Sequence, residues 1–134
     1  MQLNRFAGAS LLVALLTLPA AGQSLSPMHK TGVTPTDVKG FRLRIGNPYS
    51  KPMTFVIEPM DTQFINHAEQ AEVTPAEAKI PPGGTRSVVV QFRIPPDAKE
   101  RSVSVCVYPK EIEGSVIPRV CGTYTGQLLP KRRG

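Results

Sequence analysis

The sequence has 134 residues, of which 16 are basic and 10 acidic, with two cysteines and no tryptophan. Part of the positive excess lies in residues 130–134, which we expect to form a solvated basic tail, and only 6% of the side chains are aromatic. A nucleic-acid-binding domain needs a basic face interleaved with aromatic residues. The composition therefore argues against nucleic acid as a partner.

The first residues have the pattern of a secretory signal peptide. A positive charge at Arg5 precedes an apolar run over residues 6–18, and small or helix-breaking residues follow at positions 19–22. This order is that of a signal peptide, whereas a membrane-spanning helix needs about 20 apolar residues. We expect residues 1–22 to be removed on export to a periplasm or, as the alternative, to the cell exterior. We expect no stable membrane insertion of the mature chain.

Several short segments of the mature chain alternate between apolar and polar residues, which indicates β-strands. The first, over residues 24–29, contains Pro27, and we expect it at a sheet edge because proline cannot donate to a ladder. Residues 41–46 and 53–58 alternate clearly, and their spacing predicts an antiparallel pair joined by the loop between them. Residues 60–72 lack a helical period and are expected to form a loop.

The second half of the chain carries the clearest alternation. Residues 85–94 form the strongest predicted strand, residues 73–80 a weaker one before it, and residues 102–108 and 119–126 the last two. Five clear strands and two weak ones, about ten residues apart, are typical of an immunoglobulin-like sandwich. We therefore predict an all-β, antiparallel, immunoglobulin-like β-sandwich as a single domain over residues 23–129. A β-barrel is the alternative.

The two cysteines are expected to form a structural disulfide. If Glu113 and Gly114 form a two-residue hairpin loop, Cys106 lies directly opposite Cys121, with the Cβ atoms close enough to bridge. Export to an oxidising compartment favours this bond. The alternative is a redox or metal-binding pair, but the spacing is far from CxxC and no histidine lies nearby in sequence.

No group of residues in the sequence predicts catalysis. The histidines, His29 and His67, lie in no Ser/His/Asp or Cys/His arrangement, and no glycine-rich phosphate loop opens a helix. We therefore expect a protein that is not an enzyme and has no cofactor. A small periplasmic copper-binding protein is the alternative function, because Met28, His29 and His67 offer the thioether and imidazole ligands that suit copper.

Three segments carry a family resemblance: FRLRIGNP at residues 41–48, VTPAEAKIPPGGTRSVVVQF at 73–92 and ERSVSVCVYPKE at 100–111. They present a strand that ends in Asn, a proline-bearing turn that leads to a long strand, and an acidic residue before the next strand. In these features the chain resembles the N-terminal immunoglobulin-like domain of periplasmic pilus-assembly chaperones. Some of these chaperones carry a disulfide between the last two strands of that domain, and Cys106 and Cys121 look like that bridge.

The resemblance implies a protein that acts by protein–protein contact, as a chaperone-like accessory factor or a structural subunit of an envelope or surface assembly such as a pilus. These chaperones hold a subunit's C-terminal carboxylate with an Arg on the first strand and a Lys on the last, where this chain offers Lys30 and Arg119. The expected partner is another envelope or surface protein. If it binds by strand addition, the expected edge is the first or the last strand, with Arg119 and Tyr124 as candidate contacts.

Overall fold

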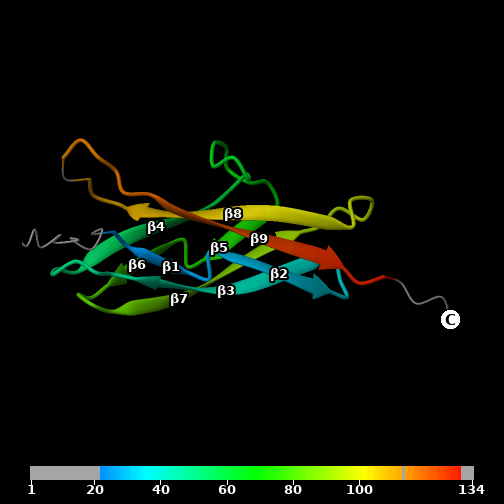
Figure 1. The fold of residues 1–134 in the computed structure, drawn as a ribbon, viewed down its shortest axis with the longest axis horizontal. Helices are drawn as coiled ribbons and strands as arrows, with labels where there is room; N and C mark the ends of the chain where they lie inside the picture. The colour runs from blue at the N-terminus through cyan, green and yellow to red at the C-terminus, as the bar shows by residue number, and fades with distance from the viewer. Residues whose placement is uncertain (1–21, 113, 131–134) are drawn as a thin grey trace, which may run out of the picture.

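The computed structural model describes residues 22–112 and 114–130, which fold as two β-sheets that face each other (Figure 1). The strands of the first sheet lie in the order β1 (Ser24–Ser26), β3 (Val38–Gly46), β7 (Thr85–Arg93), β5 (Ala71–Thr74). Those of the second sheet lie in the order β2 (His29–Thr34), β9 (Val120–Leu128), β8 (Glu100–Pro109), β4 (Met53–Met60), β6 (Glu77–Ile80). The predicted all-β sandwich is confirmed, but it is not antiparallel throughout, because β2 pairs with β9 in parallel. Within the described ranges we find no helix with the length and apolar character needed to cross a membrane.

The hydrophobic core lies between the two sheets, where alternate residues of each strand point inward. In β7, Val88, Val90 and Phe92 are at most 1% exposed, whereas Val89 between them is 38% exposed. Phe92 stacks on Phe41 of β3, with 6.2 Å between the ring centroids. Burying each such apolar side chain stabilises the fold by roughly 1.5–3 kcal/mol. The strand that the sequence predicted most strongly is therefore central to the first sheet.

The predicted pairing of residues 41–46 with residues 53–58 is wrong. The strands that contain them, β3 and β4, follow each other in the chain but belong to different sheets. Asn47 holds the loop that crosses between the sheets, because its Nδ2 donates to the carbonyl oxygens of Lys51, at 3.0 Å, and Ile80, at 2.9 Å. Both strands bury the same alternate positions whether they pair or face each other, so alternation alone does not identify their neighbours.

Two predicted strands are each divided at a proline. The segment over residues 24–29 contains β1 and only the first residue of β2, with Pro27 between them, so the rest of β2 was not predicted; residues 73–80 divide into the end of β5 and all of β6 around Pro75. In each case the earlier strand belongs to the first sheet and the later one to the second. Proline has no N–H to give to a ladder, so strand pairing stops at these residues. Seven strands were predicted, and the described part of the chain contains nine.

The last two strands pair in the predicted register but are joined by a longer loop. Cys106 lies opposite Cys121, and the two sulfur atoms are bonded, so the predicted disulfide is confirmed. The predicted two-residue turn is wrong, because β8 ends at Pro109 and β9 begins at Val120. Pro118 cannot donate a hydrogen bond to a ladder, which explains why the pairing does not extend to it. We call the residues between β8 and β9 the β8–β9 loop.

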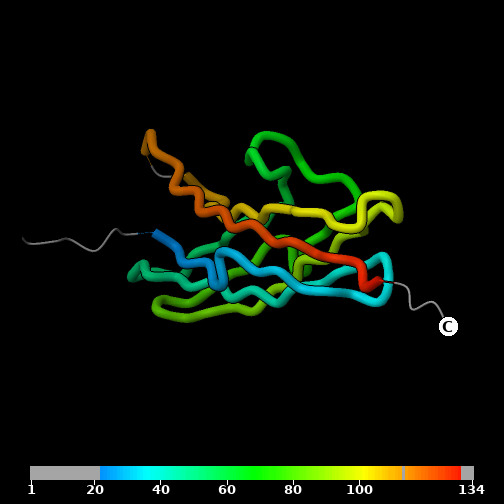
Figure 2. Tube along the Cα trace, turned by 45° about the vertical axis from the view of Figure 1, so that its right-hand side comes forward, coloured from blue at the N-terminus to red at the C-terminus, as the bar shows by residue number. Residues whose placement is uncertain are grey.

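The described chain begins and ends at opposite ends of the sandwich. The first described residues, in blue, lie at the end where the β8–β9 loop stands out, and β9 runs towards the other end (Figure 2). Residues 1–21 of the predicted signal peptide, and residues 131–134 of the predicted tail, lie outside the described residues. The β8–β9 loop and the first described residues are therefore neighbours, and Gln23 Nε2 donates to the carbonyl oxygen of Pro118.

Candidate protein-binding site

Tyr124, predicted to contact a partner at an exposed edge, is a core residue. Its side chain is 0% exposed, and its ring centroid lies 5.8 Å from that of Phe41. The hydroxyl donates a hydrogen bond to the carbonyl oxygen of Pro27 over 2.5 Å, and burial raises the pKa of Tyr124 well above its ordinary value. At this residue β9 lies between β2 and β8. The prediction of an exposed Tyr124 is therefore wrong.

The Tyr124 hydroxyl should contribute measurably to stability. In Tyr124→Phe the ring remains, but the carbonyl oxygen of Pro27 loses its donor. We expect the free energy of unfolding to fall by about 1–3 kcal/mol, the cost of leaving a buried polar group unsatisfied. Urea denaturation of the purified chain measures this difference. Tyr49→Phe removes the hydroxyl of a half-buried tyrosine and serves as the control; equal losses in the two variants would contradict the assignment.

Met28, His29 and His67, the predicted copper ligands, do not come together. Directly opposed residues of successive strands form a row that separates the two histidines, in the order His29, Thr123, Ser104, Met60, His67. Four steps of about 4.8 Å put the ends of this row roughly 19 Å apart, too far for one metal ion. Among residues 22–112 and 114–130, no three His, Cys, Asp or Glu residues form a group that could hold a metal ion.

β2 forms one edge of the second sheet. It pairs with β9 on one side only, and Lys30 on it is exposed. Beside it, Lys39 of β3 places its Nζ atom 4.9 Å from the centroid of the Phe41 ring. A Cβ atom at Gly32 of β2 would stand 2.9 Å from Lys39 Cε and 3.2 Å from Phe41 Cε1, so the lysine stem packs against the inner face of β2.

The start of β9 is open on one side. β2 covers β9 from Thr123 onward, where the Thr123 N–H donates to the carbonyl oxygen of Met28 over 2.8 Å. Residues 120–122 pair with β8 on one side and with no described strand on the other. Residues 116–119, which lead into β9, have no regular secondary structure. We call residues 116–122 the open β9 edge.

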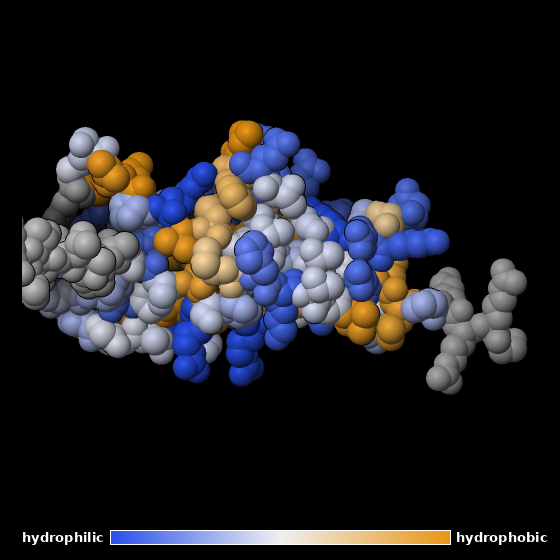
Figure 3. Space-filling view, viewed as in Figure 1, coloured by the Kyte–Doolittle hydropathy of each residue, from blue (hydrophilic) through white to orange (hydrophobic). Residues whose placement is uncertain are grey.

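The open β9 edge and the rest of the β8–β9 loop carry apolar side chains that the fold does not bury. Val116 is 76% exposed, Ile117 is 52% exposed and Ile112 is 51% exposed. Figure 3 shows hydrophobic side chains gathered where this loop stands out from the sandwich. Arg119, predicted as a partner contact, is exposed in the same segment. Grouped apolar side chains on a surface mark interaction sites, whereas single ones do not.

The three apolar loop residues were missed at the level of sequence. A signal was present, since Ile112, Val116 and Ile117 are three branched apolar residues within six positions. Their spacing fits neither a strand nor a helix, because Gly114 and Pro118 interrupt the period. Only the absence of a covering element in the structure shows that they face outward.

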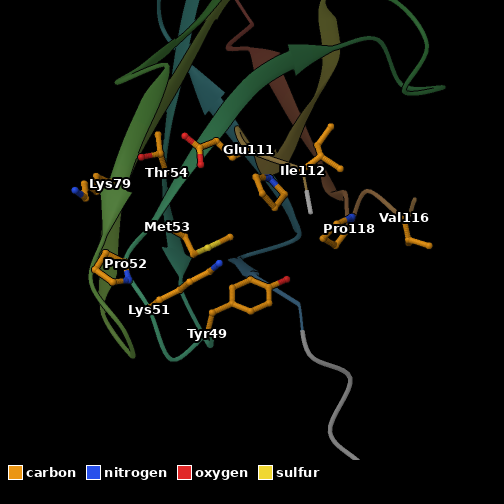
Figure 4. Close-up of a pocket in the computed structure, with 11 residues that line it drawn as sticks. Tyr49, Lys51, Pro52, Met53, Thr54, Lys79, Glu111, Ile112, Val116 and Pro118 are labelled. Atoms are coloured by element: carbon orange, nitrogen blue, oxygen red, sulfur yellow. The ribbon is translucent and has the colours of Figure 1, made fainter. Parts of the chain in front are cut away.

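A hollow of about 450 Å³ lies beside the open β9 edge (Figure 4). Figure 4 shows Pro118 and Val116 on one side of it, Lys79 and Pro52 on the other, and Met53 between them. Pockets that take a small ligand or a side-chain group measure roughly 300–1,000 Å³. The hollow is therefore large enough for one or two side chains of a partner.

Two ties hold the ends of the β8–β9 loop in place. The disulfide joins Cys106 in β8 to Cys121 in β9. The side chain of Gln23, which is 3% exposed, donates through Nε2 to the carbonyl oxygens of Val107 and Pro118, at 2.7 Å each. A segment that is held before its partner arrives loses less conformational freedom on binding. The open β9 edge is thus preorganised by its neighbours.

No family model and no curated protein sequence matches the chain. Among solved structures, PapD-like domain 7 of human CEP192 matches with a TM-score of 0.62 and 12% identity, over 86% of this chain and 90% of that one. The E. coli chaperone DraB matches with a TM-score of 0.64 and 15% identity, over 80% of this chain and 55% of that one. The Salmonella enterica SafA pilin in complex with the SafB chaperone matches with a TM-score of 0.63 and 14% identity, over 80% of this chain and 54% of that one.

These similarities concern the fold. The chain spans about half the length of the matched chains from DraB and from the SafA–SafB complex. The alignments to these three structures cover 80–86% of this chain at 12–15% identity. The chain therefore has the immunoglobulin-like fold of PapD-like domains and resembles the N-terminal domain of the pilus-assembly chaperones.

Proposed function

We propose that this chain is an exported, chaperone-like module that binds another envelope or surface protein, as an accessory factor or structural subunit of a surface assembly such as a pilus. The observation that carries the proposal is the open β9 edge, a segment with exposed Val116 and Ile117 that pairs with no described strand on its outer side. The matched SafB chaperone is in complex with the SafA pilin, and another match is a chaperone–tip adhesin complex. These likenesses support a chaperone-like role at the level of fold.

Strand addition is the binding mode that suits this edge. An extended partner segment would pair its N–H and C=O groups with those of residues 116–122. It would lie on the same side of β9 as β2, which pairs with β9 only from Thr123 onward. Main-chain hydrogen bonds of this kind provide affinity, and pockets for alternate side chains provide specificity. The hollow beside Pro118 is placed to receive one such side chain. Exposed Arg119 remains a predicted contact.

The proposal is tested by crosslinking in living cells, with a photoreactive residue in place of the exposed Ser115. We expect one abundant envelope protein in the crosslinked product. Val116→Ser combined with Ile117→Ser removes two apolar side chains from the interface, so we expect about tenfold less product, a loss of roughly 1.4 kcal/mol in binding. Mass spectrometry identifies the partner, and immunoblotting quantifies the product.

Ile65→Ser is the matched control for this experiment. Ile65 is 68% exposed in the loop between β4 and β5, so the substitution removes a comparable exposed apolar side chain elsewhere. All three substitutions are at exposed positions, and each should change the free energy of unfolding by no more than about 0.5 kcal/mol. Equal amounts of product from the double variant and from Ile65→Ser would contradict the proposal.

A further inference from the structure

The open β9 edge lies at a basic end of the molecule. The strand ends and loops that meet there include the end of β3, the start of β7, the β4–β6 pair and the β8–β9 loop. Six basic and two acidic described residues lie on them: Arg44, Lys51, Lys79, Arg86, Lys110, Arg119, Glu77 and Glu111. Glu113 adds one more acidic residue to the sequence of this loop. Positive charge remains in excess even so.

The opposite end of the sandwich has no such excess. There the described charged residues are four basic and five acidic: Lys39, Arg93, Lys99, Arg101, Asp37, Glu69, Glu72, Asp97 and Glu100. Each end holds an ion pair of 3.0 Å, Arg93 with Asp37 here and Lys110 with Glu77 at the basic end, so these pairs do not change the difference in net charge. The positive excess of the domain is therefore concentrated around the open β9 edge, and a partner that approaches this end meets a positive potential.

We infer that the partner segment which pairs with the open β9 edge is acidic, and that it carries a large apolar side chain which enters the hollow. This inference rests on the proposed function and adds the chemistry of the partner. Met53, Pro52 and Pro118 supply apolar walls for the side chain (Figure 4). Lys79 is exposed and lines the hollow, as does Glu111, and Arg119 is exposed in the paired segment.

The two parts of the partner segment have different effects. The apolar side chain leaves water when it enters the hollow, and buried anchors of this kind provide most of the affinity of an interface. Charges at an exposed rim contribute less to affinity, but they speed association and exclude partners of the same sign. An acidic segment is therefore selected over a basic one of equal apolar content.

An anionic lipid surface would also be attracted to a basic, apolar end, but it fits the geometry less well. The hollow is concave and is lined by Tyr49 and Met53 among others, so a flat bilayer would leave it unfilled. The outer side of the open β9 edge, which pairs with no described strand, offers backbone groups to a hydrogen-bonding partner. A peptide supplies matching groups in register, and acyl chains do not.

The inference is tested by selecting nonapeptides from a random displayed library on the intact chain. We expect enriched peptides to carry Asp or Glu on either side of a Leu, Ile or Phe. For the best of them, Lys79→Glu combined with Arg119→Glu should weaken binding about tenfold in fluorescence anisotropy. Raising the salt from about 50 mM to about 300 mM should weaken binding to the unmodified chain severalfold.

Arg42→Glu combined with Lys99→Glu is the matched control, because it makes the same change in net charge at exposed positions away from the open β9 edge. Enrichment of neutral or basic peptides, or an equal loss in both double variants, would overturn the acidic partner while crosslinking from position 115 still supports the proposed function. If no peptide is enriched and the chain binds phosphatidylglycerol vesicles, the inference of an acidic peptide partner would be overturned in favour of a lipid surface.

Discussion

The Gly122→Ala variant is expected to lose about 3 kcal/mol of its free energy of unfolding, the upper part of the range for overpacked sites. A Cβ atom at Gly122 would stand 2.6 Å from the carbonyl oxygen of Met28 and 2.6 Å from the hydroxyl oxygen of Tyr124. Neither atom moves away easily. The first belongs to the backbone, and the second to a side chain that is 0% exposed and bonded to Pro27.

The damage from Gly122→Ala should be concentrated in β2. Met28, which the new methyl group would displace, accepts the hydrogen bond from the Thr123 N–H that starts the pairing of β2 with β9. We therefore expect faster amide hydrogen exchange in His29–Thr34 than in the unmodified chain. Urea denaturation measures the loss of stability, and hydrogen exchange with mass spectrometry locates it.

Gly40→Ala is the matched control, since the nearest atoms to a Cβ at Gly40 stand at 3.7 Å, an ordinary contact distance. Gly40 is exposed in β3, where alanine should change the free energy of unfolding by no more than about 1 kcal/mol. If the Gly122→Ala protein were as stable as the Gly40→Ala protein, the backbone of Met28 would not pack against Gly122 of β9.

Removing the disulfide should have an effect of similar size. The bond between Cys106 and Cys121 joins residues 15 positions apart. In the chain-entropy description, a crosslink across such a ring stabilises a protein by about 3 kcal/mol because it restricts the unfolded chain. The Cys106→Ala, Cys121→Ala double variant should therefore melt about 10 °C or more below the unmodified chain, at several degrees per kcal/mol for a domain of this size.

Thermal denaturation followed by circular dichroism measures this difference. A reducing agent should lower the Tm of the unmodified chain by a similar amount and leave the double variant unchanged. Ser102→Ala combined with Thr125→Ala is the control, because it removes a neighbouring cross-strand hydrogen bond of 2.6 Å between β8 and β9. This pair should contribute no more than about 1 kcal/mol. Equal Tm values for the disulfide variant and this control would contradict the expected effect.

The loss of the disulfide should also weaken partner capture. The bond holds Cys121 within the open β9 edge, and Gln23 holds Pro118. Without the first tie, residues 116–122 must be ordered when the partner binds, and this lowers the affinity. Variants that are folded at the temperature of the crosslinking experiment separate this effect from unfolding.

Local patterns in the sequence were enough to predict most of the strands and the disulfide. Val88, Val90 and Phe92 were expected to share a face, and they are buried together in β7. The Cys106–Cys121 pairing followed from opposing the last two strands, even though the loop between them is longer than predicted. These predictions hold because side-chain alternation and strand register are set by neighbouring residues.

The tertiary structure alone decided which strands are neighbours and which edge is free. Tyr124 alternates in β9 as an edge residue would, but β2 covers that part of the strand and the ring enters the core. Ile112 and Ile117 are as apolar as core residues, yet no described strand covers them. Whether a strand edge is covered depends on segments that are distant in sequence. Here the N-terminal strand β2 pairs with β9 only in the folded chain. Alternation specifies which side of a strand is apolar, and the packing of distant strands determines whether that side is buried.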